Sequence, residues 1–495
     1  MNHKFITYYP GEYSEKDRAA LETYLSINDG IAARGEITRQ RIESGDVARG
    51  KTPGFRGGRR VSPVETKKDA KKFDCHNPLY FDEDYAKSLG YQGALAFPLA
   101  YTPDAAFYIG TPPELFQFLV ASGLNHSFEI YREVYPGDIM YCIIDKREVR
   151  DITPEAGSVY RTLDIYAEGR ILNQRGELVA AGKSNIKESL KNYADPQADP
   201  SPLYNWDNPD YHTPGVWESG DWWARPPHVY TQEDWADILS RWQKETRRGA
   251  EPLYWEDVEV GAMIPETIEG PFTTAAMTRG MPKREKPKPG DGPGQNPDAP
   301  GHEGPDGQEP PDAFGPPDMP EDPTIDWRTT KDKMLDPETR KTMRRCPENG
   351  IYYTQEDYPV LDENGKLPRR STIGNYMPTA FMFKTLYDWM GDRGRLHAIS
   401  WGIMFENPGI PETLVPRSAR TPDFLSNVPF LKDAKISAHA LMGDLCINNG
   451  YITDKYFKPG IGYCVDLTWW CKTYTDEIFE AGRATVILPH RNGDE

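Results

Sequence analysis

Two short loops of this 495-residue chain carry side chains of the types that move protons. In the first, Asp74 and His76 stand two residues apart and Tyr80 follows; in the second, Glu348 precedes Tyr352. An imidazole titrates near neutral pH, so a carboxylate beside it suits general acid–base chemistry. A tyrosine, with a pKa of about 10, is a poor base but a good hydrogen-bond donor. The competing interpretation is that each tyrosine packs in a core and that His76 makes only a structural hydrogen bond.

The two loops resemble each other. Residues 77–81 read Asn-Pro-Leu-Tyr-Phe and residues 349–353 read Asn-Gly-Ile-Tyr-Tyr, and an Asp-Tyr pair follows each of them. An apolar stretch that predicts a buried helix comes next, at 98–119 in the first half and 378–390 in the second. Duplication of one plan is the simplest explanation.

Alternating patterns predict the strands that position these loops. One buried helix followed by long antiparallel strands predicts an α+β fold, with the sheet wrapped around the helix. We expect strands at 128–135, 139–148, 158–168 and 177–186 in the first half, and at 397–405, 434–442, 463–473 and 480–488 in the second.

Composition divides the chain into four parts. The stretch near 281–325 is rich in Pro and Gly and cannot bury a core, whereas the tryptophans of the connector are expected to pack on the domains. The parts are a polar, partly helical extension at 1–60, a first domain at 61–186, a Trp- and Pro-rich connector at 187–251, and a second domain at 252–495 with an insertion at about 281–325.

Charge and patterning exclude several classes of function. The net charge of −18 opposes binding to nucleic acid or to an anionic membrane, so an anionic ligand needs a local basic patch such as Arg369 and Arg370. No apolar run of 18 residues, no signal-peptide core and only six scattered cysteines lead us to expect a reduced, cytoplasmic protein. No metal-ligand spacing, nucleotide fingerprint or GxSxG elbow is present, and we expect no metal.

Five stretches resemble the MaoC-like acyl-CoA hydratase/dehydratase superfamily, in its fused form with an N-terminal fatty-acid-synthase-type dehydratase domain. They are residues 76–86, 131–138, 247–261, 388–392 and 481–489.

The resemblance implies a tandem, or double, hot-dog fold. Each half is then an antiparallel sheet wrapped around a central helix, and the two halves pair edge to edge, which buries their strand edges. The resemblance also implies that coenzyme A enters as part of an acyl thioester substrate, with no other cofactor. It further implies that the chain forms a homodimer or a higher homo-oligomer.

The sequence departs from the family at the residues that hold the attacking water. Family members use an Asp and a His on the loop before the central helix; here Tyr80 and Tyr352 stand at the His positions, and Cys75 and Pro347 at the Asp positions. In one interpretation the displaced Asp74 and His76 do the chemistry. In another a tyrosine acts as acid or donor, and in a third both sites are inactive.

The remaining candidates follow from the same resemblance. Asn77 and Asp82 belong to the first loop, and Phe97 and Pro98 begin the first central helix. Substrate contacts are also expected at Gly374, Asn375 and Tyr376 before the second helix, and at Arg369 and Arg370 for the phosphates.

The sequence therefore predicts a lyase that adds water to, or removes it from, an acyl-CoA with an unusual, bulky or aromatic acyl group. Two alternatives stay open. One is an inactive protein that binds acyl thioesters as a scaffold. The other is a thioesterase that uses a carboxylate such as Asp74, Asp82 or Glu348.

Overall fold

The computed structural model describes about three fifths of the chain. Among the predicted features, most of the helix at 98–119, the insertion at about 281–325 and the segment 368–376 lie outside the described residues. The described residues are 3–15, 18–19, 21–22, 25, 59–98, 119–153, 160–191, 227–273, 326–367, 377–403, 428–431, 434 and 440–493.

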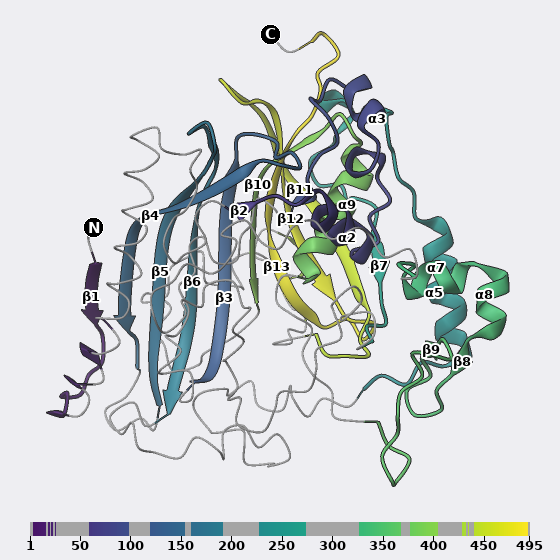
Figure 1. Cartoon of the computed structure of the whole chain (residues 1–495), viewed down its shortest axis with the longest axis horizontal. Coiled ribbons are helices and arrows are strands. Elements are labelled where there is room, and N and C mark those ends of the chain that lie inside the picture. Colours follow the sequence, from purple (N-terminus) through teal and green to yellow (C-terminus); the bar gives the residue numbers. More distant parts are fainter. Residues whose placement is uncertain are drawn as a thin grey trace.

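One large sheet runs through the described part of the molecule (Figure 1). Its order is β1-β4-β5-β6-β3-β10-β13-β12-β11-β7, with the short β2 paired to β4. All neighbours are antiparallel except β1 and β4. The first half contributes β1 (His3–Thr7), β2 (Arg59–Arg60), β3 (Leu119–Ile130), β4 (Ile139–Asp151), β5 (Tyr160–Asn173) and β6 (Leu178–Lys191). The second contributes β7 (Thr267–Glu269), β10 (Arg395–Ile403), β11 (Cys446–Lys458), β12 (Gly462–Lys472) and β13 (Ile478–Ile487).

The two half-sheets join where β3 pairs with β10, and we call this junction the seam. Phe128 lies opposite Ile399 and His126 opposite Trp401 in an antiparallel register. A hydrogen-bonded seam removes the edge that each half-sheet would otherwise expose. This strand order confirms the predicted double hot-dog fold.

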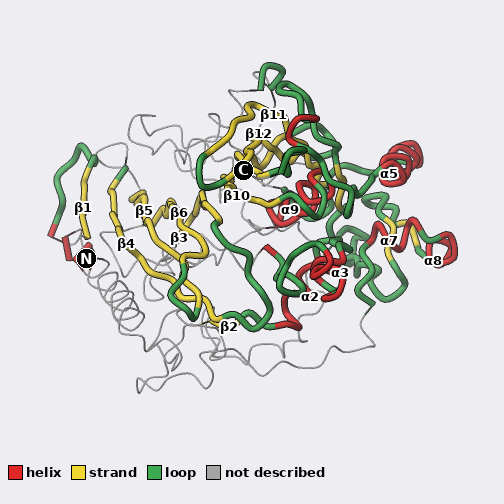
Figure 2. Tube along the Cα trace, turned by 90° about the horizontal axis from the view of Figure 1, so that it is seen from above, coloured by secondary structure: helices red, strands yellow, loops and turns green. Residues whose placement is uncertain are grey.

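Helix α9 (Met377–Met390) is the central helix of the second half. It lies beside β11 and β12 in both views (Figures 1 and 2), and most of its described side chains, including Phe381, Phe383 and Leu386, are buried. A helix that is apolar on nearly all sides must be buried, as its sequence predicted. The sheet face that α9 covers, which carries Phe128 and Ile399, is called the core face below.

Smaller elements surround α9. The first half supplies α2 (Pro63–Lys72), the 3-10 turn η2 (Pro78–Tyr80) and α3 (Glu83–Ser88). Farther out lie α5 (Gln232–Lys244), α7 (Thr330–Leu335), α8 (Pro337–Thr342), the turn η7 (Trp255–Asp257) and the two-stranded sheet of β8 (Arg344–Arg345) and β9 (Tyr352–Tyr353). The connector tryptophans Trp235 and Trp242 on α5 are buried and donate to the carbonyls of Gly350 and Ile268. None of the described helices has the length and hydrophobicity needed to cross a bilayer.

One strand was predicted at the wrong place. The strand expected at 128–135 is displaced, because β3 spans Leu119–Ile130 and residues 131–135 belong to no strand. The strand expected at 434–442 lies mostly outside the described residues; its described positions, 434 and 440–442, belong to no named strand, and β11 follows at Cys446–Lys458. Asn448 and Asn449 interrupt the apolar alternation expected of a strand in β11, yet both of their side chains are buried. The Asn448 side chain is satisfied there, because it accepts from the thiols of Cys446 and Cys471 and donates to the Thr267 hydroxyl.

Substitution of Gly482 on β13 tests the register between the strands of the second half. A Cβ atom there would lie 1.6 Å from the Ser400 carbonyl oxygen on β10, so we expect Gly482→Ala to lower the free energy of unfolding by more than about 3 kcal/mol. Gly90→Ala is the control for backbone strain, because its φ is positive at 95° and no atom lies within 4 Å; that strain alone should cost about 1–2 kcal/mol, whereas Gly482 is not among the glycines with positive φ and its cost comes from the clash. Equal costs in urea titrations would contradict the register.

Candidate active site at the seam

The first loop is fixed at its start by Asn77. Its side-chain oxygen accepts the backbone N–H of Leu79 at 2.9 Å and caps the turn η2, while its amide donates to Asp392 Oδ1 at 2.6 Å. Asn349 repeats the cap in the second loop, where it accepts the N–H of Ile351 at 3.0 Å. The same local hydrogen bond in both loops supports the duplication predicted from the sequence.

Asp392, just beyond α9, joins the two halves. Its side chain is fully buried and binds Asn77 and Tyr85 of the first half together with Arg247, whose Nη1 lies 2.9 Å away. Its backbone N–H donates to the Gly249 carbonyl at 2.8 Å. Three of the stretches that carry the family resemblance, 76–86, 247–261 and 388–392, therefore meet at this one carboxylate.

His76 and Asp74 come together in the first loop. Asp74 is buried in a left-handed conformation, with φ of 55°, and His76 Nε2 lies 3.2 Å from Asp74 Oδ1 and 3.4 Å from Asp332 Oδ1. Hydrogen bonds to Asp332 and to Asp74 outweigh partial burial and raise the pKa of His76 to about 10. At neutral pH His76 is therefore an imidazolium, which is no base.

Asp74 also belongs to a buried network of charges. Burial alone would raise its pKa, but the Lys331 ammonium 3.2 Å away and His76 hold the pKa of Asp74 far below its usual range. Lys331 further contacts Glu245 and Glu269, and Lys384 on α9 lies 2.9 Å from Asp388 and 3.7 Å from Glu269. Burial raises the pKa of Glu269 well above its usual range, although Lys331 and Lys384 lie 3.5 and 3.7 Å from its carboxyl group.

A metal ion would meet competition in this loop. Asp74, His76 and Asp332 each bring one potential ligand atom within 4.8 Å of the others. A divalent cation would have to displace the proton of His76 and would lie close to the Lys331 ammonium, which is 3.2 Å from Asp74.

The other candidate residues of the first loop pack in the core or cap a helix. Tyr80 is 1% exposed and packs edge-on against Phe97 and Tyr387, with ring centroids 5.5 and 6.3 Å apart. Phe97 is buried between Tyr80 and the ring of Phe73, and Pro98 is buried beside it. Asp82 is exposed and caps α3 by accepting the N–H of Tyr85 at 2.9 Å.

The second-loop candidates lie at the outer helices. Tyr352 exchanges a hydrogen bond with Gln232 on α5 and packs against Trp235, and Glu348 is exposed. The other candidates of this half, Arg369, Arg370, Gly374, Asn375 and Tyr376, lie outside the described residues.

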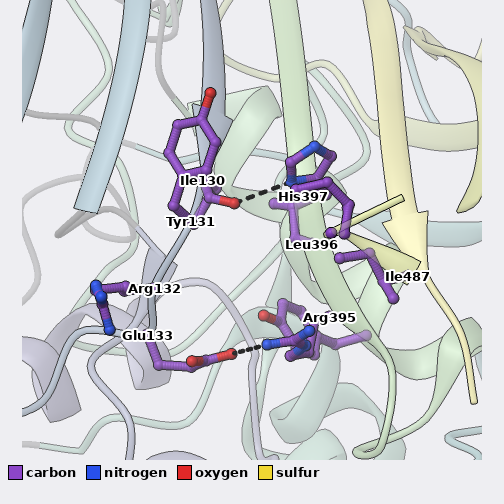
Figure 3. A pocket seen from close by; sticks show the side chains of 11 residues that line it. Ile130, Tyr131, Arg132, Glu133, Arg395, Leu396, His397 and Ile487 are labelled. Atoms are coloured by element: carbon purple, nitrogen blue, oxygen red, sulfur yellow. Dashed lines mark hydrogen bonds and ion pairs between the residues drawn. The ribbon is translucent and has the colours of Figure 1, made fainter. Parts of the chain in front are cut away.

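A cavity of about 230 Å³ opens at one end of the seam (Figure 3). It lies where β3 ends, β10 begins and the β11–β12 turn approaches, and Tyr387 on α9 connects it to the buried ring of Tyr80. The described residues that line it are Ile130, Tyr131, Arg132, Glu133, Tyr387, Arg395, Leu396, His397, Gly460, Ile461 and Ile487.

His397 has a defined tautomer in this cavity. Its Nδ1 lies 3.1 Å from the Ile130 carbonyl oxygen, so Nδ1 bears the proton and Nε2 keeps its lone pair, 3.5 Å from Lys458 Nζ. Burial, and to a lesser degree the charges of Lys458 and Arg395, lower the pKa of His397 despite its bond to Ile130. His397 is therefore neutral at pH 7 and has the lone pair that His76 lacks.

Cations surround this imidazole. Arg395 and Arg132 are about half exposed, and their ion pairs with Glu133 and Glu177 are long, at 3.6 and 3.7 Å. Together with Lys458 they form the local basic patch that an anionic ligand requires on a chain of net charge −18. The sequence predicted only that His397 begins a strand. The grouping of this imidazole with the three cations depends on the pairing of the two halves.

Comparison with known proteins gives matches in structure alone. No family model matches the chain, and no curated protein matches its sequence. Three matched structures each cover 88% of this chain: a MaoC-like dehydratase (13% identity, 97% of that chain, TM-score 0.41), a putative MaoC domain protein dehydratase from Chloroflexus aurantiacus (12%, 96%, 0.41) and a conserved hypothetical protein from Mycobacterium tuberculosis with a double hot-dog fold (10%, 94%, 0.37).

The charge state of His76 has a measurable consequence. We expect its C2 proton to titrate by NMR near pH 10, and Asp332→Asn to lower that pKa. Because the folded pKa lies above the unfolded value of about 6.5, these ion pairs contribute fully to stability below pH ~6.5 and lose their contribution as the pH rises through about 10. His76→Ala should therefore destabilise more at pH 6 than at pH 11. A titration near 6.5 would contradict the geometry of the loop.

Proposed function

We propose that this double hot-dog chain is a MaoC-like hydratase or dehydratase that acts on acyl-CoA thioesters in the cavity at the seam. The observation that carries the proposal is the neutral imidazole of His397, which keeps an Nε2 lone pair beside cations in a cavity between the halves. In this proposal neither loop supplies the base, because His76 is protonated and Tyr80 is packed in the core.

Hydration would need one group to move a proton twice. His397 Nε2 takes a proton from water, whose oxygen bonds to the β carbon of the enoyl thioester as the double-bond electrons move to the thioester oxygen. The resulting imidazolium then returns the proton to the α carbon, so one water is added and no redox partner is needed. The Lys458 ammonium near Nε2 would stabilise the negative charge that develops on oxygen. Dehydration is the reverse sequence.

The walls of the cavity suit a coenzyme A ester. Arg132 and Arg395 are held by long ion pairs, so phosphate oxygens would exchange readily with Glu177 and Glu133. Tyr131, Tyr387 and Ile487 supply aromatic and aliphatic contacts to an acyl group. These walls support a bulky or aromatic acyl group as substrate.

A non-catalytic thioester-binding protein is the second candidate, because both loops lack the usual dyad. Hydrolysis is less well supported. Among the described lining residues Glu133 is the one carboxylate, and it pairs with Arg395.

Purified protein incubated with enoyl- and 3-hydroxyacyl-CoA thioesters in ¹⁸O-water tests this function. We expect labelled water to be added, and His397→Gln to lower kcat by about 10²–10⁴-fold, the usual contribution of an acid–base group. Arg395→Gln should mainly raise KM. His228→Gln is the control, since His228 pairs with Asp234 near α5 and is not among the residues that line the cavity.

Three results would contradict the proposal. Label in a free acid with release of coenzyme A indicates a thioesterase. Saturable binding without turnover indicates a scaffold. Loss of turnover in His76→Ala but not in His397→Gln would move the reaction to the first loop.

A further inference from the structure

A row of five residues crosses the core face next to the seam. His126 on β3 pairs with Trp401 on β10, which pairs with Gly482 on β13, then Trp469 on β12 and Gly450 on β11. Residues paired in register point to the same face of a sheet, and Trp401 and Trp469 belong to the core that contains α9. The row is therefore part of the wall that faces the interior.

Two members of this row carry polar atoms without a partner. Among the described residues, neither ring nitrogen of His126, which is 3% exposed, nor Nε1 of the fully buried Trp469 has a hydrogen-bond partner. Buried polar groups nearly always have partners, and leaving one unpaired costs free energy. Two such residues in one row of the sheet point to a ligand that supplies the partner.

The surroundings of His126 fit an organic group. Its ring lies 4.7 Å from Trp401 and 5.8 Å from Phe128, measured between centroids. Burial lowers the pKa of His126 to about 3, so the imidazole is neutral and offers one donor and one acceptor. A neutral imidazole matches an uncharged hydroxyl, which also donates and accepts, better than it matches a buried carboxylate.

The row and the cavity lie on the same two strands of the seam. Ile130 and Leu396 line the cavity, and the core-face residues that follow them are Phe128 on β3 and Ile399 on β10. His126 comes next, four residues from Ile130, which is about 13 Å along a strand. Along these strands the residues next to the cavity are thus apolar, and the polar His126 follows them.

We infer that the acyl group of the substrate extends from the cavity along the core face of the seam and carries a terminal hydroxyl that binds His126. This inference rests on the proposed function and defines its substrate class as oxygenated acyl thioesters. An unsubstituted chain would leave both nitrogens of His126 unpaired, whereas a hydroxyl at the right distance would satisfy one or both of them.

Calorimetric titration with saturated acyl-CoA esters tests the inference separately from turnover, because these esters cannot be hydrated. Pairs with chains of eight to fourteen carbons, with and without a terminal hydroxyl, would be compared on the full-length protein. At one chain length we expect the hydroxyl to tighten Kd by about tenfold, the upper range of a net hydrogen bond.

Two histidine variants assign the preference to its residue. His126→Phe should bring the ratio of the two Kd values to about 1, and the matched His228→Phe should leave the ratio unchanged. His126→Gln, which retains a donor and an acceptor, serves as a second variant should the Phe variant not fold.

If the two Kd values of the wild-type protein agree within twofold at every chain length, the inference is overturned without reference to any variant. Equal binding of both kinds of ester would leave the proposed function intact. If no ester binds, both the proposed function and the inference are contradicted. A preference for the hydroxyl without hydration of enoyl esters supports the inference and removes the lyase.

Discussion

The buried carboxylate of Asp392 is the interaction on which the arrangement of the site depends. A fully buried charge is stable only with ionic and hydrogen-bonding partners, and Asp392 has Arg247 from the connector and Asn77 and Tyr85 from the first half. These bonds place the first loop against the end of α9. Tyr80 of that loop then packs on Tyr387, which itself lines the cavity.

The polar groups near α9 fall into two sets. One is a buried cluster of charges, and the other lines the cavity at the seam. Lys384 on α9 enters a buried cluster of acids and lysines that also holds Asp74 and Glu269. About one helical turn further along, Tyr387 borders a cavity with a neutral histidine and half-exposed arginines. The first-loop histidine is thus held as a cation by carboxylates, whereas the seam histidine is kept neutral by burial and by neighbouring cations.

Much of the fold could be predicted from the sequence because its determinants are local. The alternation in β4, β5, β6, β12 and β13 and the apolar run of α9 each report burial within one element. Strand β11 could not be predicted, because the partners of Asn448, namely Cys446, Cys471 and Thr267, include two residues from strands distant in sequence. A polar residue in a strand pattern is compatible with burial only once such partners are known.

The candidate site was less predictable for a related reason. The resemblance identified the loop of Asp74, His76 and Asn77, and the structure brings these residues close together. It could not indicate that Asp332, more than 250 residues away, fixes the proton of His76, or that Ile130 fixes the tautomer of His397. Charge state and tautomer depend on long-range pairing, which a single sequence does not encode in any local pattern.

The most direct measurement is a crystal structure of the protein with a saturated acyl-CoA bound. The account predicts the thioester in the seam cavity, with its carbonyl and β carbon within reach of His397 Nε2 and its phosphates near Arg132 and Arg395. A thioester bound instead at Asp74 and His76, with the seam cavity empty, would contradict it.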